Sequence, residues 1–262
     1  MLFCRFFYHY LHKLVFFRNF VFKNIFLNIM IKKSTLERII GDDLSELWAT
    51  LTADEKRLLT DNFKYERYKK NQIIYAESET PENLYCLLEG KVKLFKSGYG
   101  DRVQILRLYR PVQYFGYRAY FAQEPYVSSA AAFEPSVLGI IPMKVVEEII
   151  RNNTVAAMFF IHELSCNLGG SDTKIINLTQ KHIRGRLADA LLLLADNYGY
   201  EDDDQTLKIY MSREDLANLS NMTTSNAIRT LSTFMNEKLI LVDGRRIRIM
   251  NEPQLRKISK FG

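Results

Sequence analysis

The sequence contains few of the residues that build metal sites, disulfides or membrane spans. Only three cysteines and four histidines occur in 262 residues, without CxxC or Cys/His spacing, so neither a disulfide framework, a metal site nor another cofactor is predicted. A P-loop, an HExxH motif and a nucleophile elbow are all lacking, so an enzyme is not expected. No apolar run reaches membrane-spanning length.

The net charge of +6 also excludes little, because it is unevenly distributed. Residues 1–29 hold four basic side chains and no acidic one, whereas positive and negative charges nearly balance in the rest. This basic, phenylalanine-rich leader fits two interpretations. One is an amphipathic helix at a membrane surface. The other is translated upstream DNA, rich in residues with AT-rich codons, with Met30 as the natural start; we therefore treat 1–29 as a non-native or disordered leader.

The part of the chain from Phe63 to Pro142 consists of short β-type runs divided by turns. Apolar segments such as 83–97 and 102–109 are separated by glycine-containing turns. Strands this short and closely spaced predict an antiparallel β jelly roll, with helices before it, in residues 30–142.

The periodicity becomes helical from Met143 onward. A short helix at 143–152 is followed by a predicted helix from about Thr154 to Gln180. Residues of its apolar stripe recur about every 3.5 positions, so we expect residues 143–182 to pair with a second copy of the chain. The stripe comprises Val155, Phe159, His162, Cys166, Gly169, Thr173 and Ile176.

The last third of the chain predicts a helix, a tight turn, a second helix and a hairpin. Ser212 is a good N-cap with Asp215 three residues on, Asn221 suits the turn, and Thr223 caps the second helix. The spacing is that of a helix-turn-helix. The predicted inner face of the second helix is Ala227, Ile228, Leu231 and Phe234.

Polar side chains lie on the predicted exposed face of this second helix. Thr224, Ser225, Asn226 and Arg229 can hydrogen-bond to base edges in a major groove. The following hairpin, with a predicted turn at Asp243-Gly244, adds a basic edge suited to phosphates. That edge consists of Arg245, Arg246 and Arg248.

In this order of elements the chain resembles the Crp/Fnr family of bacterial transcription regulators, over roughly Leu47 to Ile249. The resemblance is specific in "MSREDLANLSNMTTSNAIRTLSTFMNEKLI" and looser in the barrel, where "ENLYCLLEGKVKLF" matches best. It implies an α+β fold in which a jelly roll, a long dimerisation helix and a winged helix-turn-helix at 183–262 follow one another. It also implies a homodimer with two recognition helices about 34 Å apart on DNA.

The resemblance assigns individual DNA contacts. Ser212 and Arg213 match phosphate-contacting positions of the family, and Thr224, Ser225 and Arg229 match its base-reading positions. The expected DNA-binding residues are Ser212, Arg213, Thr223, Thr224, Ser225, Asn226, Arg229 and Arg245.

The segment 116–133 corresponds to the phosphate cassette of cyclic-nucleotide-responsive relatives. Those proteins need a glutamate for the ribose and an arginine for the phosphate, but Tyr117 and Val127 stand here. We therefore expect either a ligand other than cAMP or cGMP, or a site packed shut by tyrosines. The possible effector pocket comprises Tyr117, Arg118, Tyr126, Ser128, Ser129, Ser171 and Asp172.

Taken together, these features predict a cytoplasmic, sequence-specific DNA-binding transcription regulator. It is expected to act as a homodimer on a near-palindromic site, with double-stranded DNA, RNA polymerase and an unknown effector as partners, and with no membrane. A small-molecule sensor module with weak or vestigial DNA binding is the alternative.

Overall fold

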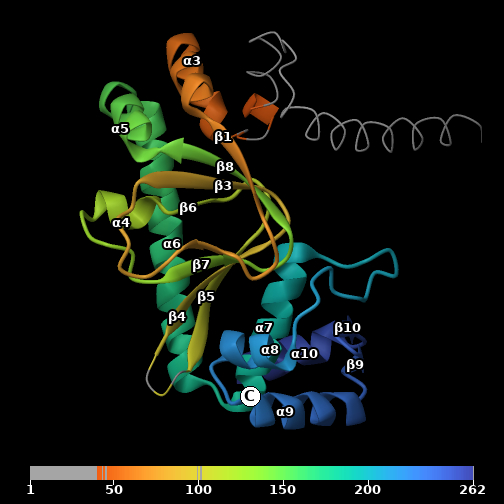
Figure 1. The fold of residues 1–262 in the computed structure, drawn as a ribbon. Coiled ribbons are helices and arrows are strands. Elements are labelled where there is room, and N and C mark those ends of the chain that lie inside the picture. The colour runs from red at the N-terminus through yellow and green to blue at the C-terminus, as the bar shows by residue number, and fades with distance from the viewer. Residues whose placement is uncertain (1–39, 43, 45, 99, 101, 262) are drawn as a thin grey trace, which may run out of the picture. The chain divides into compact units, whose positions relative to one another are not determined.

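The computed structural model describes residues 40–261 except for positions 43, 45, 99 and 101 (Figure 1). The leader interpreted above, 1–29, lies outside the described residues. Every element discussed below belongs to one compact unit, Asp43–Gly262.

Two four-stranded antiparallel sheets form the first half of this unit. One sheet has the strand order β1-β8-β3-β6 and the other β2-β7-β4-β5, as expected for a jelly roll. The strands are β1 (Lys64–Tyr68), β2 (Ile73–Tyr75), β3 (Asn83–Glu89), β4 (Val92–Ser97), β5 (Val103–Tyr109), β6 (Tyr114–Phe115), β7 (Ser129–Ala132) and β8 (Ser136–Pro142).

Aromatic rings fill the space between the two sheets. Tyr75 stacks on Tyr126 with ring centroids 3.7 Å apart, and Tyr85 stacks on Phe115 at 5.3 Å. Gly116, which follows β6, has a positive φ of 93°, and a Cβ there would lie 2.7 Å from the ring of Tyr85. The close approach of β3 to this turn therefore depends on glycine.

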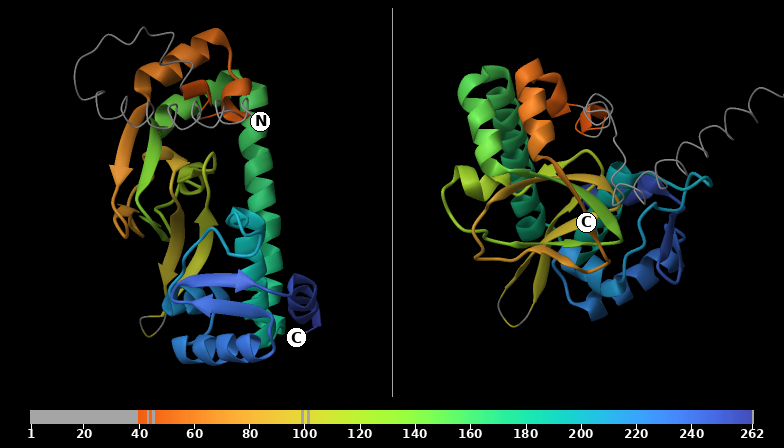
Figure 2. Two further views of the ribbon diagram at one scale, coloured as in Figure 1. Left: turned by 90° about the vertical axis from the view of Figure 1, so that its right-hand side faces the viewer. Right: turned by 45° about the horizontal axis from the view of Figure 1, so that its top comes forward.

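The helices that accompany the sheets include α3 (Ala53–Asn62), α4 (Tyr117–Phe121), α5 (Met143–Asn152) and α6 (Thr154–Gln180). The bounds of α6 agree with the predicted long helix. The side chain of Asn153 caps it by accepting a hydrogen bond from the Ala156 amide at 3.0 Å. Figures 1 and 2 show α6 running past the sheets to the helices of the second half.

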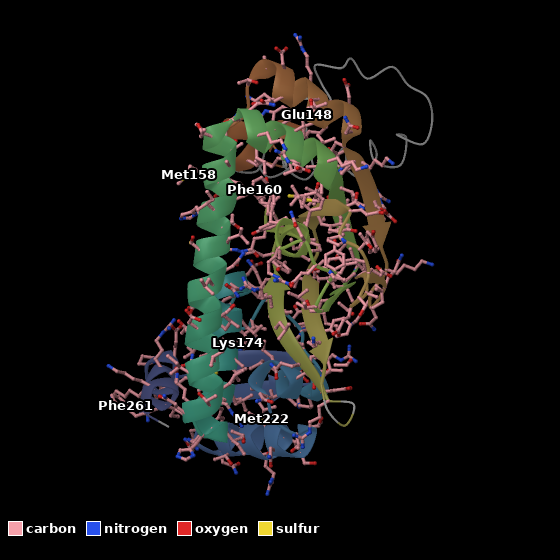
Figure 3. The ribbon with its side chains drawn as sticks, turned by 90° about the vertical axis from the view of Figure 1, so that its left-hand side faces the viewer. Glu148, Met158, Phe160, Lys174, Met222 and Phe261 are labelled. Carbon is pink, nitrogen blue, oxygen red and sulfur yellow. The ribbon has the colours of Figure 1, made fainter. Side chains whose placement is uncertain are left out.

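The two sides of α6 differ in environment. Phe160 points toward the sheets and is 3% exposed, whereas Met158 points away and is 58% exposed (Figure 3). Phe159, which the predicted stripe included, packs edge-on against Tyr114 with ring centroids 5.5 Å apart. The large apolar residues exposed on this helix are Val155, Met158, Ile161, Leu168, Ile175 and Ile176.

The second half holds α7 (Ile183–Tyr198), α8 (Arg213–Ser220), α9 (Thr224–Asn236), the hairpin β9 (Ile240–Asp243) and β10 (Arg246–Ile249), and α10 (Glu252–Phe261). Leucines of α7 form the centre of its core, which continues into Ile105 and Leu108 of β5. Helix α10, which the sequence reasoning missed, packs on α7 through Leu255 and Ile258.

The architecture confirms the predicted α+β class, with antiparallel sheets, a long helix and a C-terminal helix-turn-helix. Within the described part of the chain, every helix is too short or too polar to cross a lipid bilayer.

Candidate nucleic-acid interface and sensor pocket

The turn between α8 and α9 has the geometry of a helix-turn-helix. Asn221 ends α8 in the left-handed conformation, with φ 51° and ψ 58°, and the Met222 amide bonds to the carbonyl oxygen of Ala217 at 3.0 Å. Asparagine tolerates this conformation better than most residues, so the turn follows from the sequence.

Polar caps fix the start of each of the two helices. The Ser212 hydroxyl accepts a hydrogen bond from the Asp215 amide at 3.0 Å, and the Asp215 carboxylate accepts one from the Ser212 amide at 3.4 Å. The Thr223 hydroxyl likewise accepts a bond from the Asn226 amide at 3.3 Å. Both predicted caps are therefore present, and each leaves other helix N–H groups available to an anion.

The predicted base-reading side chains share one surface at the start of α9. Thr224, Ser225 and Arg229 are exposed, and Asn226 is half-buried. The guanidinium of Arg229 donates a hydrogen bond to the Asn226 side-chain oxygen. This contact orients the arginine while leaving most of its donors free, as bidentate recognition of a base requires.

One residue of α9 was placed wrongly by the sequence reasoning. Ala227, Leu231 and Phe234 are buried, as predicted, but Ile228 is 47% exposed. Its neighbour Ala227 occupies the centre of the buried stripe, and successive helical residues are about 100° apart, so Ile228 lies on the flank.

The hairpin after α9 has the wing-like position expected, with a turn shifted by one residue. Asp243 pairs with Arg246, so the two-residue turn is Gly244-Arg245 rather than Asp243-Gly244. Arg245 is exposed at this tip. Arg248 instead forms an ion pair with Asp203 at 2.8 Å, which engages it within the protein.

The cassette segment begins with helix α4 rather than with a charged loop. Tyr117 is buried, its ring packs edge-on against Phe160 at 5.4 Å, and its hydroxyl accepts a hydrogen bond from Asn167 at 3.1 Å. Burial raises the pKa of Tyr117 well above its ordinary value, so this hydroxyl stays neutral. It therefore supplies no charge to replace the missing glutamate.

A cavity of about 370 Å³ nevertheless lies beside α4, so the tyrosines do not close the site. Tyr126 lines it with a buried hydroxyl that has no hydrogen-bond partner, and Ser128 is buried beside it. Of the predicted pocket residues, the lining includes Tyr117, Arg118, Tyr126, Ser128 and Ser171.

Two residues of the predicted pocket are not brought to this cavity. The hydroxyl of Ser129 instead accepts a hydrogen bond from the Glu77 amide at 2.9 Å. Asp172 is exposed on α6. Arg118 lines the cavity, but its guanidinium also pairs with Glu124 at 2.7 Å.

The cation that sequence reasoning missed is Arg107 on β5. It lines the cavity and donates hydrogen bonds to the carbonyl oxygen of Asn167 at 2.7 Å and to the Ser171 hydroxyl at 3.0 Å, and also to the Asn167 side chain. An arginine between Leu106 and Leu108, in a strand whose other residues are mostly apolar, was the available signal.

Comparison with known proteins decides the family. Residues 65–153 match the model of the cyclic nucleotide-binding domain, and residues 185–258 match that of the Crp-like helix-turn-helix domain. The chain belongs to the Crp/Fnr family of transcription regulators. This Crp/Fnr protein is therefore a DNA-binding transcription regulator and not an enzyme.

Individual relatives agree with this assignment. A global nitrogen regulator from Nostoc sp. is 24% identical to this Crp/Fnr protein over 187 residues, which cover 70% of the chain and 84% of that relative. The structure of FixK2 from Bradyrhizobium japonicum has a TM-score of 0.68 at 21% identity, covering 75% of this chain and 97% of that one. A Crp/Fnr family transcriptional regulator from Thermus thermophilus has a TM-score of 0.61 at 21% identity, covering 75% and 98%. The two structural likenesses establish the fold.

Proposed function

We propose that this regulator acts as a homodimer on a near-palindromic DNA site, and that it reads bases with Thr224, Ser225 and Arg229. The observation that carries the proposal is the exposed, capped start of α9 with its hydrogen-bonding side chains. Ser212, Arg213, Thr223, Asn226 and Arg245 would complete the contact set, with the arginines on phosphates.

The exposed apolar face of α6 supports pairing of two chains. Met158, Ile161, Leu168 and Ile175 are each more than half exposed in one chain. Together with the intervening positions Ser165 and Asp172, they follow alternating steps of three and four residues, the spacing that joins two helices in a coiled coil. Burying this face against a second copy would remove large apolar side chains from water.

The compartment and the remaining partners follow from this role. A regulator that binds DNA near a promoter works where the DNA and the polymerase are, so we place it in the cytoplasm with RNA polymerase as a further partner. We also propose that the cavity of about 370 Å³ beside α4 takes a small effector. Its unpartnered Tyr126 hydroxyl and the guanidinium of Arg107 would supply polar contacts.

Selection from a random DNA library with the full chain is the direct test of the proposal. The enriched sites are expected to be inverted repeats whose half-sites are one helical turn apart, about 34 Å. Footprinting on a selected duplex should then protect both half-sites. Enrichment of single, unpaired half-sites would contradict the dimeric mode, and metabolite binding without any DNA selection would favour the sensor-module alternative.

Cyclic AMP is expected to leave this regulator unchanged. A buried phosphodiester needs a cation at the phosphate, but Val127 stands where cyclic-nucleotide-responsive relatives carry arginine, and Arg118 is paired with Glu124. Even a Kd of about 1 mM would require about 4 kcal/mol of favourable binding free energy, which this site lacks the contacts to supply. Calorimetry with cAMP up to about 1 mM should therefore show no saturable heat. The same preparation should bind the selected duplex with or without cAMP. A saturable cAMP isotherm would refute this expectation.

A further inference from the structure

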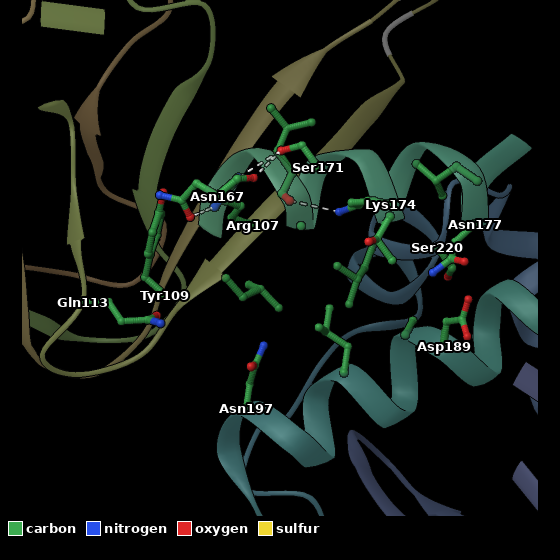
Figure 4. A pocket seen from close by; sticks show the side chains of 18 of the residues that line it. Arg107, Tyr109, Gln113, Asn167, Ser171, Lys174, Asn177, Asp189, Asn197 and Ser220 are labelled. Carbon is green, nitrogen blue, oxygen red and sulfur yellow. Dashed lines mark hydrogen bonds between the residues drawn. The ribbon is translucent and has the colours of Figure 1, made fainter. Parts of the chain in front are cut away.

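A second cavity lies at the junction of the sheets with the DNA-binding half. It has a volume of about 470 Å³ and is bounded by β5, the C-terminal half of α6, α7 and the end of α8 (Figure 4). Leu219 and Ser220, just before the Asn221 turn, form part of its wall. A ligand here would contact both β5 and the helix-turn-helix.

Three basic side chains line this cavity: Arg107, Lys174 and Arg186. Lys174 donates hydrogen bonds to the backbone oxygens of Ile105 at 2.9 Å and Leu106 at 3.0 Å. Arg186 donates one to the backbone oxygen of Leu178 at 3.1 Å, and its Nε is buried without any hydrogen-bond partner.

The acidic residues of the lining do not neutralise these cations. Asp189 forms an ion pair with Lys181 at 2.8 Å and accepts a bond from Ser259, and Glu163 is the other acid. Among the residues that the structure describes, Arg107, Lys174 and Arg186 form no ion pair with a carboxylate. Partly buried cations without counter-charges are unfavourable. Burial, and secondarily Arg107, lower the pKa of Lys174 to about 8.

Apolar side chains cover the rest of the wall. Leu106, Leu108, Leu178 and Leu193 line the same cavity as the three cations. The combination of apolar walls with a few convergent polar groups is typical of a small-molecule site. The cations specify a negative charge, and the leucines specify an apolar body attached to it.

We propose that this junction cavity binds a small organic oxyanion, with its charged group near Lys174 and Arg186 and its apolar part against the leucines. This site is distinct from the effector pocket beside α4, although Arg107, Tyr109, Asn167 and Ser171 line both cavities. Because its walls come from β5, α6, α7 and α8, the bound anion favours whichever arrangement of these elements it fits best.

Phenyl phosphate and inorganic phosphate are the probes, titrated calorimetrically into the full chain without DNA. Phenyl phosphate is expected to bind one per chain, about tenfold or more tighter than inorganic phosphate, because the leucines of the cavity bury the ring. The Arg186 variants below distinguish this cavity from the pocket beside α4. The exposed DNA-contacting surface would bind both probes equally. Equal affinities, or no saturable binding, would overturn the proposal.

Substitution of Arg186 identifies the site. The Arg186→Gln variant is expected to bind phenyl phosphate about tenfold more weakly, and Arg186→Lys should recover part of the affinity because it keeps the charge. Arg184→Gln is the matched control, since this arginine lies on the same helix but pairs with Glu237. If Arg186→Gln fails to fold by circular dichroism, Lys174→Gln takes its place with the same expectation. An equal loss in Arg184→Gln, or an unchanged affinity in the folded cavity variant, would contradict the site.

Discussion

Replacing Arg229 with alanine is expected to abolish most of the sequence-specific DNA binding of this regulator. Arg229 is exposed on α9, and its guanidinium bonds only to the neutral side chain of Asn226 among the described residues. A bidentate contact between arginine and guanine contributes about 1–3 kcal/mol of discrimination, and a symmetric dimer makes it twice. The expected loss is therefore roughly thirtyfold to ten-thousandfold in affinity for the selected site.

Fluorescence anisotropy at fixed salt, on the selected duplex and on unrelated DNA, measures this loss. The affinity for unrelated DNA should fall much less, because phosphate contacts dominate there. Arg151→Ala is the matched control: it removes the same charge from an exposed arginine, on α5. An equal loss on both duplexes would assign Arg229 to phosphate contact, and an unchanged affinity would remove it from the interface.

The helix-turn-helix could be read from the sequence because its signals are local. The caps at Ser212 and Thr223 bond to amides three residues away, and the left-handed Asn221 ends a helix by its own conformation. The long helix was predictable for the same reason: its Asn153 cap and its periodicity lie within the segment. Such features need no knowledge of the tertiary fold.

The half of the chain that contains the two sheets was less predictable, because its polar contacts join segments that are far apart in the sequence. Arg107 bonds to residues 60 and 64 positions away on α6. Arg248, predicted to lie on a phosphate-binding edge, pairs with Asp203, 45 positions away. Periodicity shows which face of a strand is buried, but it does not show which charge from another element meets it. Both cavities are lined by side chains that such contacts between distant segments bring together.

Placing a charge on the exposed face of α6 is expected to separate the proposed dimer. Ile176 is 53% exposed in one chain, belongs to the stripe predicted from the sequence and lies next to Ile175 of the face that would pair. A glutamate there would be buried without a partner in each chain, which costs several kcal/mol, and twofold symmetry would double that cost. Ile176→Glu should therefore sediment as a monomer at micromolar concentration, whereas the parent chain sediments as a dimer.

Ile73→Glu is the matched control, because Ile73 is 48% exposed on β2 and lies outside this face. It should remain dimeric and bind DNA normally.

Loss of the dimer should weaken DNA binding strongly even though the recognition helix α9 is unchanged. In a dimer, the second half-site is bound intramolecularly at a high effective concentration, and a monomer loses that advantage entirely. The expected loss for Ile176→Glu is about a hundredfold or more on the inverted repeat and little on an isolated half-site. A dimeric Ile176→Glu with normal affinity would exclude this face as the interface. A monomeric variant with normal affinity would instead show that one chain suffices for recognition. The contacts of one α9 with its half-site would then not depend on a second chain bound to the other half-site.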